Sequence, residues 1–121
     1  MNYNYNQEYE YYYCQYPHFT ICIEETYFNN FTIKWAEDIV KIIEQRLLVG
    51  ITYIINTSLF IANYGKYSIE EFLRHYKIFP LPNIWLKGDN IGIVEWIDDN
   101  YVVSCVFKGM MEEFDGIEIS S

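Results

Sequence analysis

Basic residues are scarce in this sequence of 121 residues: eight Lys and Arg stand against 17 Asp and Glu, and the formal net charge is −9. Direct binding to nucleic-acid phosphates or to an anionic membrane needs basic surface, so the balance argues against both. Residues 1–34 hold four acids and one base, residues 35–79 five of each, and residues 80–121 eight acids and two bases. An acidic surface of this kind favours a basic partner, or serves solubility alone.

Cysteine and histidine are also scarce. The three cysteines, Cys14, Cys22 and Cys105, are odd in number and form no CxxC pair, so a secreted disulfide framework is not indicated. We expect buried free thiols in a reducing compartment. The two histidines, His18 and His75, occur in no HxH, HxxxH or Cys/His spacing that would bind zinc. The sequence therefore predicts no metal and no cofactor.

Catalytic motifs are missing as well. There is no GxSxG elbow and no glycine-rich phosphate loop, because the six glycines are spread singly. A Cys14–His18 pair is conceivable, but the nearby Glu8 and Glu10 are unfavourable for a thiolate. We predict a protein that is not an enzyme. A small enzyme whose site assembles only in space stays open as a third class.

Long apolar runs are limited to residues 47–62, which carry no charge. Asn56, Thr57 and Ser58 interrupt this run, and it is shorter than the ~20 residues of a transmembrane helix, so we interpret it as a core segment. The N-terminus shows no basic region followed by an apolar stretch, so no signal peptide is indicated. We expect a cytoplasmic protein without membrane contact, in the host cytoplasm if it is viral.

Helical signals lie in the middle of the chain. Ser68 and Glu71 form a capping box ahead of an apolar stripe, which predicts a helix over residues 69–78. A second helix is predicted over residues 35–50, with Gly50 as its C-terminal cap. Residues 51–63 contain β-formers but could also be a buried helix, and we favour helix for part of them.

Strand signals dominate the C-terminal part. Residues 83–87, 91–97 and 101–107 are rich in β-formers and are separated by turn residues, so they predict a three-stranded meander. Residues 18–28 supply one or two more strands. The prediction is a single α+β domain over residues 1–121, with an antiparallel sheet of four or five strands on two or three helices. Whether residues 1–8 are ordered or form a loose segment is left open. Residues 110–121 are interpreted as an acidic tail.

The N-terminal stretch, residues 2–17, contains seven tyrosines, and its only charged residues are two glutamates. Tyrosine offers a rigid apolar face with a hydroxyl, is enriched in binding hot spots and stacks on guanidinium groups. We expect an edge strand with one tyrosine face directed into the fold and the other available to a partner. The predicted partner-binding residues here are Glu8, Tyr9, Glu10, Tyr11, Tyr12 and Tyr13.

Acidic residues gather in the C-terminal third. Carboxylates spaced along a small protein can occupy sites that a basic protein uses for phosphates. The predicted partner-binding residues of this part are Asp98, Asp99, Glu112, Glu113 and Asp115. Tyrosines that form an ordinary edge strand, and acids that form a solvated tail, are the competing interpretations.

These features together indicate a small acidic protein that inhibits a basic, nucleic-acid-acting protein such as a nuclease by direct contact, without itself binding nucleic acid. In size, charge and composition the chain resembles the anti-CRISPR and anti-restriction inhibitors of phages and viruses, and the immunity proteins that neutralise nuclease toxins. The resemblance includes no motif, so it implies no site residues. The alternative is a viral or bacterial structural protein that self-assembles as a homodimer.

Overall fold

The computed structural model describes residues 2–75, 82–97 and 101–120. Within these ranges the chain forms seven strands, four α-helices and one short 3-10 helix, η1. In chain order the elements are β1 (Asn4–Asn6), β2 (Tyr11–Gln15), β3 (Thr20–Glu24), η1 (Glu25–Tyr27), α1 (Asn30–Val40), α2 (Ile43–Ile55), α3 (Ser58–Tyr64), α4 (Ile69–His75), β4 (Asn83–Leu86), β5 (Ile91–Ile97), β6 (Val102–Lys108) and β7 (Glu113–Ser120).

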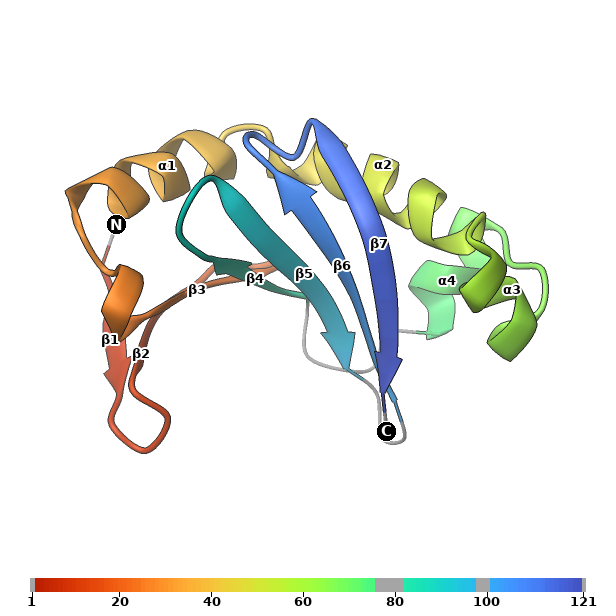
Figure 1. Ribbon diagram of the computed structural model, residues 1–121, viewed down its shortest axis with the longest axis horizontal. Coiled ribbons are helices and arrows are strands. Elements are labelled where there is room, and N and C mark those ends of the chain that lie inside the picture. The colour runs from red at the N-terminus through yellow and green to blue at the C-terminus, as the bar shows by residue number, and fades with distance from the viewer. Residues whose placement is uncertain (1, 76–81, 98–100, 121) are drawn as a thin grey trace.

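All seven strands join one sheet in their sequence order, from β1 at one edge to β7 at the other. Neighbouring strands are antiparallel except β3 and β4, which are parallel. A parallel pair needs a crossover, and the four helices provide it. They lie along one side of the sheet (Figure 1). The predicted α+β class is confirmed, whereas the sheet has more strands than the four or five predicted, contains one parallel pair, and packs on four α-helices rather than two or three.

The second predicted helix was placed wrongly. Residues 30–55 form two helices, because a turn at Lys41 and Ile42 separates them. The amides of these two residues donate to the carbonyls three residues earlier, of Asp38 and Ile39. Gly50 does not end a helix but lies buried inside α2. A Cβ added there would lie 2.9 Å from Cε1 of Phe114 in β7, so glycine is required for the close approach of helix and sheet.

The other helical predictions fare better. Residues 51–63 fall in α2 and α3, as favoured. The capping box of α4 is present, with the Ser68 amide donating to Glu71 Oε1 and the Glu71 amide donating to Ser68 Oγ, both at 3.1 Å. Positions 76–78 of the predicted helix lie outside the described residues.

Over the described residues, no single helix is long and apolar enough to span a bilayer. The pair α2 and α3 satisfies that criterion only when both are counted together, and a bend of 73° separates them.

The predicted meander is confirmed as β4, β5 and β6, which pair antiparallel. Residues 18–28 supply one strand, β3. The additional strands lie at the two chain ends. Residues 4–6 and 11–15 form a hairpin, so the edge of the sheet is β1 rather than the tyrosine-rich β2. Residues 113–120 form β7 instead of a tail, because Phe114, Ile117 and Ile119 pack against the core.

The core lies between the helices and the sheet. Phe60, Phe72 and Phe107 are fully buried there among isoleucines of both layers. Two polar anchors reach from the helices to the β6–β7 turn. Trp35 Nε1 donates to the Gly109 carbonyl at 2.8 Å, and the Arg46 guanidinium donates twice to a second carbonyl of that turn. These bonds hold the β6–β7 edge of the sheet against the helices.

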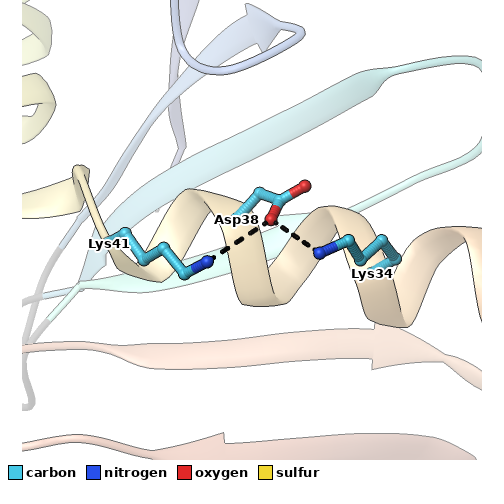
Figure 2. A network of polar contacts seen from close by, with 3 residues as sticks. All are labelled: Lys34, Asp38 and Lys41. Atoms are coloured by element: carbon cyan, nitrogen blue, oxygen red, sulfur yellow. Dashed lines mark hydrogen bonds and ion pairs between the residues drawn. The ribbon is translucent and has the colours of Figure 1, made fainter.

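The outer surface of α1 carries an ion-pair network. Figure 2 shows Asp38 between Lys34 and Lys41, and its Oδ1 lies 3.2 Å and 3.9 Å from their Nζ atoms. Both lysines are largely exposed, so solvent screens these pairs and each contributes only tenths of a kcal/mol. This network supports α1 and has no feature of a chemical site.

Candidate functional site

One side of the sheet carries no helix within the described residues (Figure 1). Successive side chains of a strand point to opposite sides, so the strand register assigns each residue to a face. Fully buried residues such as Ile84, Val94 and Val103 point to the helices, and their neighbours point away. We call the second side the open face; across β2–β6 it consists of Tyr11, Tyr13, Gln15, Thr20, Cys22, Glu24, Asn83, Trp85, Ile91, Ile93, Glu95, Ile97, Val102, Ser104, Val106 and Lys108.

An apolar row crosses the middle of the open face. The pairing runs from Tyr13 to Cys22, Trp85, Ile93 and Val106, on five successive strands. Only Cys22 is buried, at 2% exposure, and the other four remain partly exposed. Partly exposed aromatic and β-branched side chains in one continuous row form an apolar surface that no described element covers, and such surfaces are typical of binding faces.

A polar row borders this apolar row on one side, and a row of mixed charged, aromatic and apolar residues borders it on the other. On one side, Thr20, Asn83, Glu95, Ser104 and Glu118 are cross-strand partners. The Glu95 carboxylate is fixed there, because Oε1 accepts hydrogen bonds from Asn83 at 3.2 Å and from the Trp85 indole at 2.9 Å. A row of apolar side chains within a polar border is the anatomy of a protein–protein interface.

On the other border, aromatic rings and charges are in direct contact. The Tyr11 ring lies 5.0 Å from the Trp85 ring. Lys87 forms an ion pair with Glu24, and its Nζ lies 5.7 Å from the centre of the Trp85 ring. Burial, followed by the nearby Cys22 thiol, raises the pKa of Tyr11, so its hydroxyl stays protonated and can donate.

The turn of the β1–β2 hairpin and the start of β2 line a hollow of about 240 Å³ beside this border. We call it the hairpin hollow; its lining consists of Tyr9, Glu10, Tyr11, Glu24, Glu25, Thr26 and Trp85. Glu10 adopts a positive φ of 55° at the hairpin turn, and its carbonyl accepts from the Glu25 amide at 3.1 Å. This bond holds the hairpin tip against η1 and brings the carboxylates of two distant segments together.

The predicted tyrosine site divides between the two faces. Tyr11 and Tyr13 are on the open face, and Tyr9, Glu8 and Glu10 lie in or beside the hairpin turn. Tyr12 points to the helix side, where its ring stacks on Phe28 with 3.8 Å between centroids. Tyr12 therefore packs within the fold and does not share a surface with its two neighbours.

The predicted acidic site lies at the opposite edge of the sheet. Glu113 pairs with Lys108 on the open face, and Asp115 lies 4.0 Å from the same lysine. Glu112 closes the β6–β7 turn, where Oε1 accepts from the Met110 amide. Five strand spacings of ~4.8 Å separate β2 from β7, so these acids are roughly 24 Å from the tyrosines. Asp98 and Asp99 lie outside the described residues.

The thiols and imidazoles form no reactive group over the described part of the chain. All three cysteines are buried and free. Burial, then the charge of Glu95, raises the pKa of Cys22 to about 12, so its thiol stays protonated. Cys14 is buried and interacts with Tyr16, whereas His18 is exposed. No group of three or more His, Cys, Asp or Glu could hold a metal ion among the described residues.

A larger hollow, of about 680 Å³, lies between α2 and α4. Its floor is apolar, formed by Leu47, Ile51 and Trp96, and its rim carries charges of both signs. His18, Glu44 and Glu70 are its titratable acid or imidazole residues, and no thiol shares the described lining with them.

Several residues of the open face were not predicted from the sequence. Trp85 and Ile93 occupy the centre of the apolar row, and Glu24, Glu25 and Glu95 supply carboxylates next to it. The sequence does carry one signal for them, because strand alternation over residues 91–97 puts Ile93 and Glu95 on the face opposite Val94 and Trp96. No protein-family model, curated protein or solved structure matches the chain.

Proposed function

We propose that this protein binds a basic partner protein through its open face and thereby inhibits it, without catalysing a reaction. The observation that carries the proposal is the apolar row from Tyr13 to Val106, bordered by rows in which acids outnumber bases. Buried aromatic anchors supply most of the binding energy in protein interfaces. Tyr11, Tyr13 and Trp85 are the aromatic residues placed to act in this way.

Charge supports a partner of opposite sign. The open face and its edges hold Glu10, Glu24, Glu95, Glu113 and Glu118, whereas its described bases are two lysines, each beside a carboxylate. The net charge of −9 adds attraction at longer range. Complementary charge chiefly speeds association and fixes the orientation of the two partners.

The dimensions of the surface are compatible with one interface. A standard interface covers about 800 Å² on each partner, which is broad enough to reach from β2 to β7. A partner that met the tyrosines at one edge and the acids at the other would place its basic surface over the whole sheet. If that basic surface normally holds nucleic-acid phosphates, this protein competes with the nucleic acid for it. Inhibition of a nuclease or related effector follows from that competition.

Self-assembly as a homodimer has less support. The edge strand β1 has three residues, which is short for pairing with a second copy. The longer edge strand β7 carries Glu113, Asp115 and Glu118, and two such edges would repel each other. Light scattering at ~100 μM distinguishes the cases, because a dimer at that concentration would favour the alternative.

The test compares two lysine substitutions that change the net charge equally. Ile93→Lys introduces a cation in the apolar row, and Leu48→Lys introduces one on an exposed helical position of α2. Tagged versions of both proteins and of the unchanged chain are used to capture partners from a bacterial lysate. A partner of the open face is captured by the unchanged chain and by Leu48→Lys, and is lost with Ile93→Lys.

The affinity and the association rate are then measured with the purified partner. Ile93→Lys should weaken its binding at least tenfold, which is about 1.4 kcal/mol, and Leu48→Lys should leave it within threefold. The association rate should fall as the salt concentration rises. The partner should release its nucleic acid when this protein is added. Equal binding by both variants, or a rate that does not depend on salt, contradicts the proposal.

A further inference from the structure

We infer that the hairpin hollow is a binding site for one arginine side chain. This inference rests on the proposed function, because it assigns the part of the partner that would enter this side of the open face. The hollow is concave, about 240 Å³ in volume, and therefore has the scale of one long side chain rather than of a folded element.

The walls of the hairpin hollow combine the two groups that recognise a guanidinium. Three aromatic residues, Tyr9, Tyr11 and Trp85, are part of the lining, and 70% of the surface of Tyr9 is exposed. Glu10 and Glu25 offer carboxylates. A guanidinium is planar, stacks on aromatic rings and donates paired hydrogen bonds to a carboxylate, whereas an ammonium is a point charge that cannot stack in this way.

A cation of the chain itself already uses part of this lining. Lys87 forms an ion pair with Glu24 while its Nζ lies over the Trp85 ring. The combination of a carboxylate and an aromatic face therefore holds a positive charge in this structure. The lining contains three glutamates, and Lys87 pairs with one of them, Glu24, which leaves two negative charges for a second cation.

Hydrogen bonds hold the backbone of the turn and the Glu25 side chain before any ligand arrives. The Glu10 carbonyl accepts from the Glu25 amide, and the Tyr5 hydroxyl donates to Glu25 Oε2 at 3.2 Å. The Tyr9 amide donates to Asn6 at 3.0 Å, which shapes the turn. Little ordering is left to oppose binding, so even an isolated arginine should bind measurably.

The experiment titrates the full chain, labelled with ¹⁵N, with N-acetyl-arginine amide at low salt. The indole N–H signals provide an internal control, because Trp85 lines the hollow whereas Trp35 and Trp96 are buried in the core. We expect saturable shifts of the Trp85 indole and of the amides of residues 9–11 and 24–26, with the other two indoles unchanged. N-acetyl-citrulline amide, which is neutral, should produce no such shifts, and N-acetyl-lysine amide should bind several-fold more weakly.

Charge variants test the residues. The double variant Glu10→Gln/Glu25→Gln should weaken arginine binding about fivefold. The control Glu113→Gln/Glu118→Gln, with the same net charge but changed at the far edge, should bind as the unchanged chain does. Lys87→Gln should bind at least twofold more tightly, because it removes the competing cation. The spectrum of each variant also reports whether the fold is intact.

Three results would overturn the assignment: equal shifts with citrulline, equal affinity for lysine, or equal weakening by both double variants. The probe requires no partner protein. Its failure therefore removes the arginine site alone, while the comparison of Ile93→Lys with Leu48→Lys decides the proposed function separately.

Discussion

The contact between Gly92 and Phe107 gives the sharpest prediction about this fold. The two residues are cross-strand partners in β5 and β6 on the helix side, and Phe107 is fully buried. A Cβ built on Gly92 would lie 2.2 Å from Phe107 Cζ and 2.6 and 2.7 Å from two further ring atoms. Carbon atoms in contact prefer about 3.5–4.0 Å, so the ring must move by more than 1 Å.

The ring has no room for that movement. Trp35 lies 6.4 Å from it, between centroids, and is held by its own hydrogen bond to the Gly109 carbonyl. Overpacking of this kind costs about 1–3 kcal/mol. We expect overpacking in Gly92→Ala to lower the free energy of unfolding by about 2 kcal/mol. Alanine also restricts the unfolded chain, which offsets about 0.5 kcal/mol of this loss. For a chain of this size the melting temperature should fall by roughly 6–10 °C.

Urea unfolding followed by circular dichroism measures this loss. The control is Phe107→Leu, which removes the ring atoms that clash and destabilises the protein by itself. In that background Gly92→Ala should cost under about 0.5 kcal/mol, so a double-mutant cycle should report a coupling above about 1 kcal/mol. A small loss for Gly92→Ala in the unchanged chain, or additive losses in the cycle, would refute the packing described for this pair.

Three further predictions concern stability. Trp35→Phe deprives the Gly109 carbonyl of its donor and should lower the free energy of unfolding by about 2 kcal/mol, seen as a lower urea midpoint. Ser68→Ala removes the acceptor of the Glu71 amide and should cost about 1 kcal/mol, with faster amide exchange confined to the first turn of α4. The folded state raises the pKa of Cys22 from 9.0 to about 12, so the unfolded chain releases this proton first as pH rises. The contribution of the protonated Cys22 thiol to stability should therefore be fully present below pH 9 and be lost between pH 9 and 12. The free energy of unfolding should fall less steeply with pH in Cys22→Ala, and equal slopes in the two proteins would contradict this.

The sequence determined the features that depend on near neighbours in the chain. The capping box at Ser68, the strands of the meander and the turn at residues 88–90 follow from local chemistry. Strand alternation also placed Ile93 and Glu95 on one face, because the period of a strand does not depend on what covers it. The excess of acids and of tyrosines was visible without any coordinates.

Tertiary structure decided which of these features meet. Gly50 has the pattern of a helix end, and only the approach of Phe114 from β7 explains a glycine inside α2. The final residues are strongly acidic, but alternate apolar side chains reach the core and make them a strand. Their local composition resembles a tail because the energy that orders them comes from contacts distant in sequence.

The candidate site depended on tertiary structure most of all. Trp85 meets Tyr11 only because the crossover through four helices returns the chain to pair β4 with β3. The same pairing brings Glu24 to Lys87, 63 residues apart. The sequence thus determined that aromatic and acidic groups were present, whereas the parallel pairing of β3 and β4 decided that they share one face, because strand register is set by burial of the opposite face against the helices.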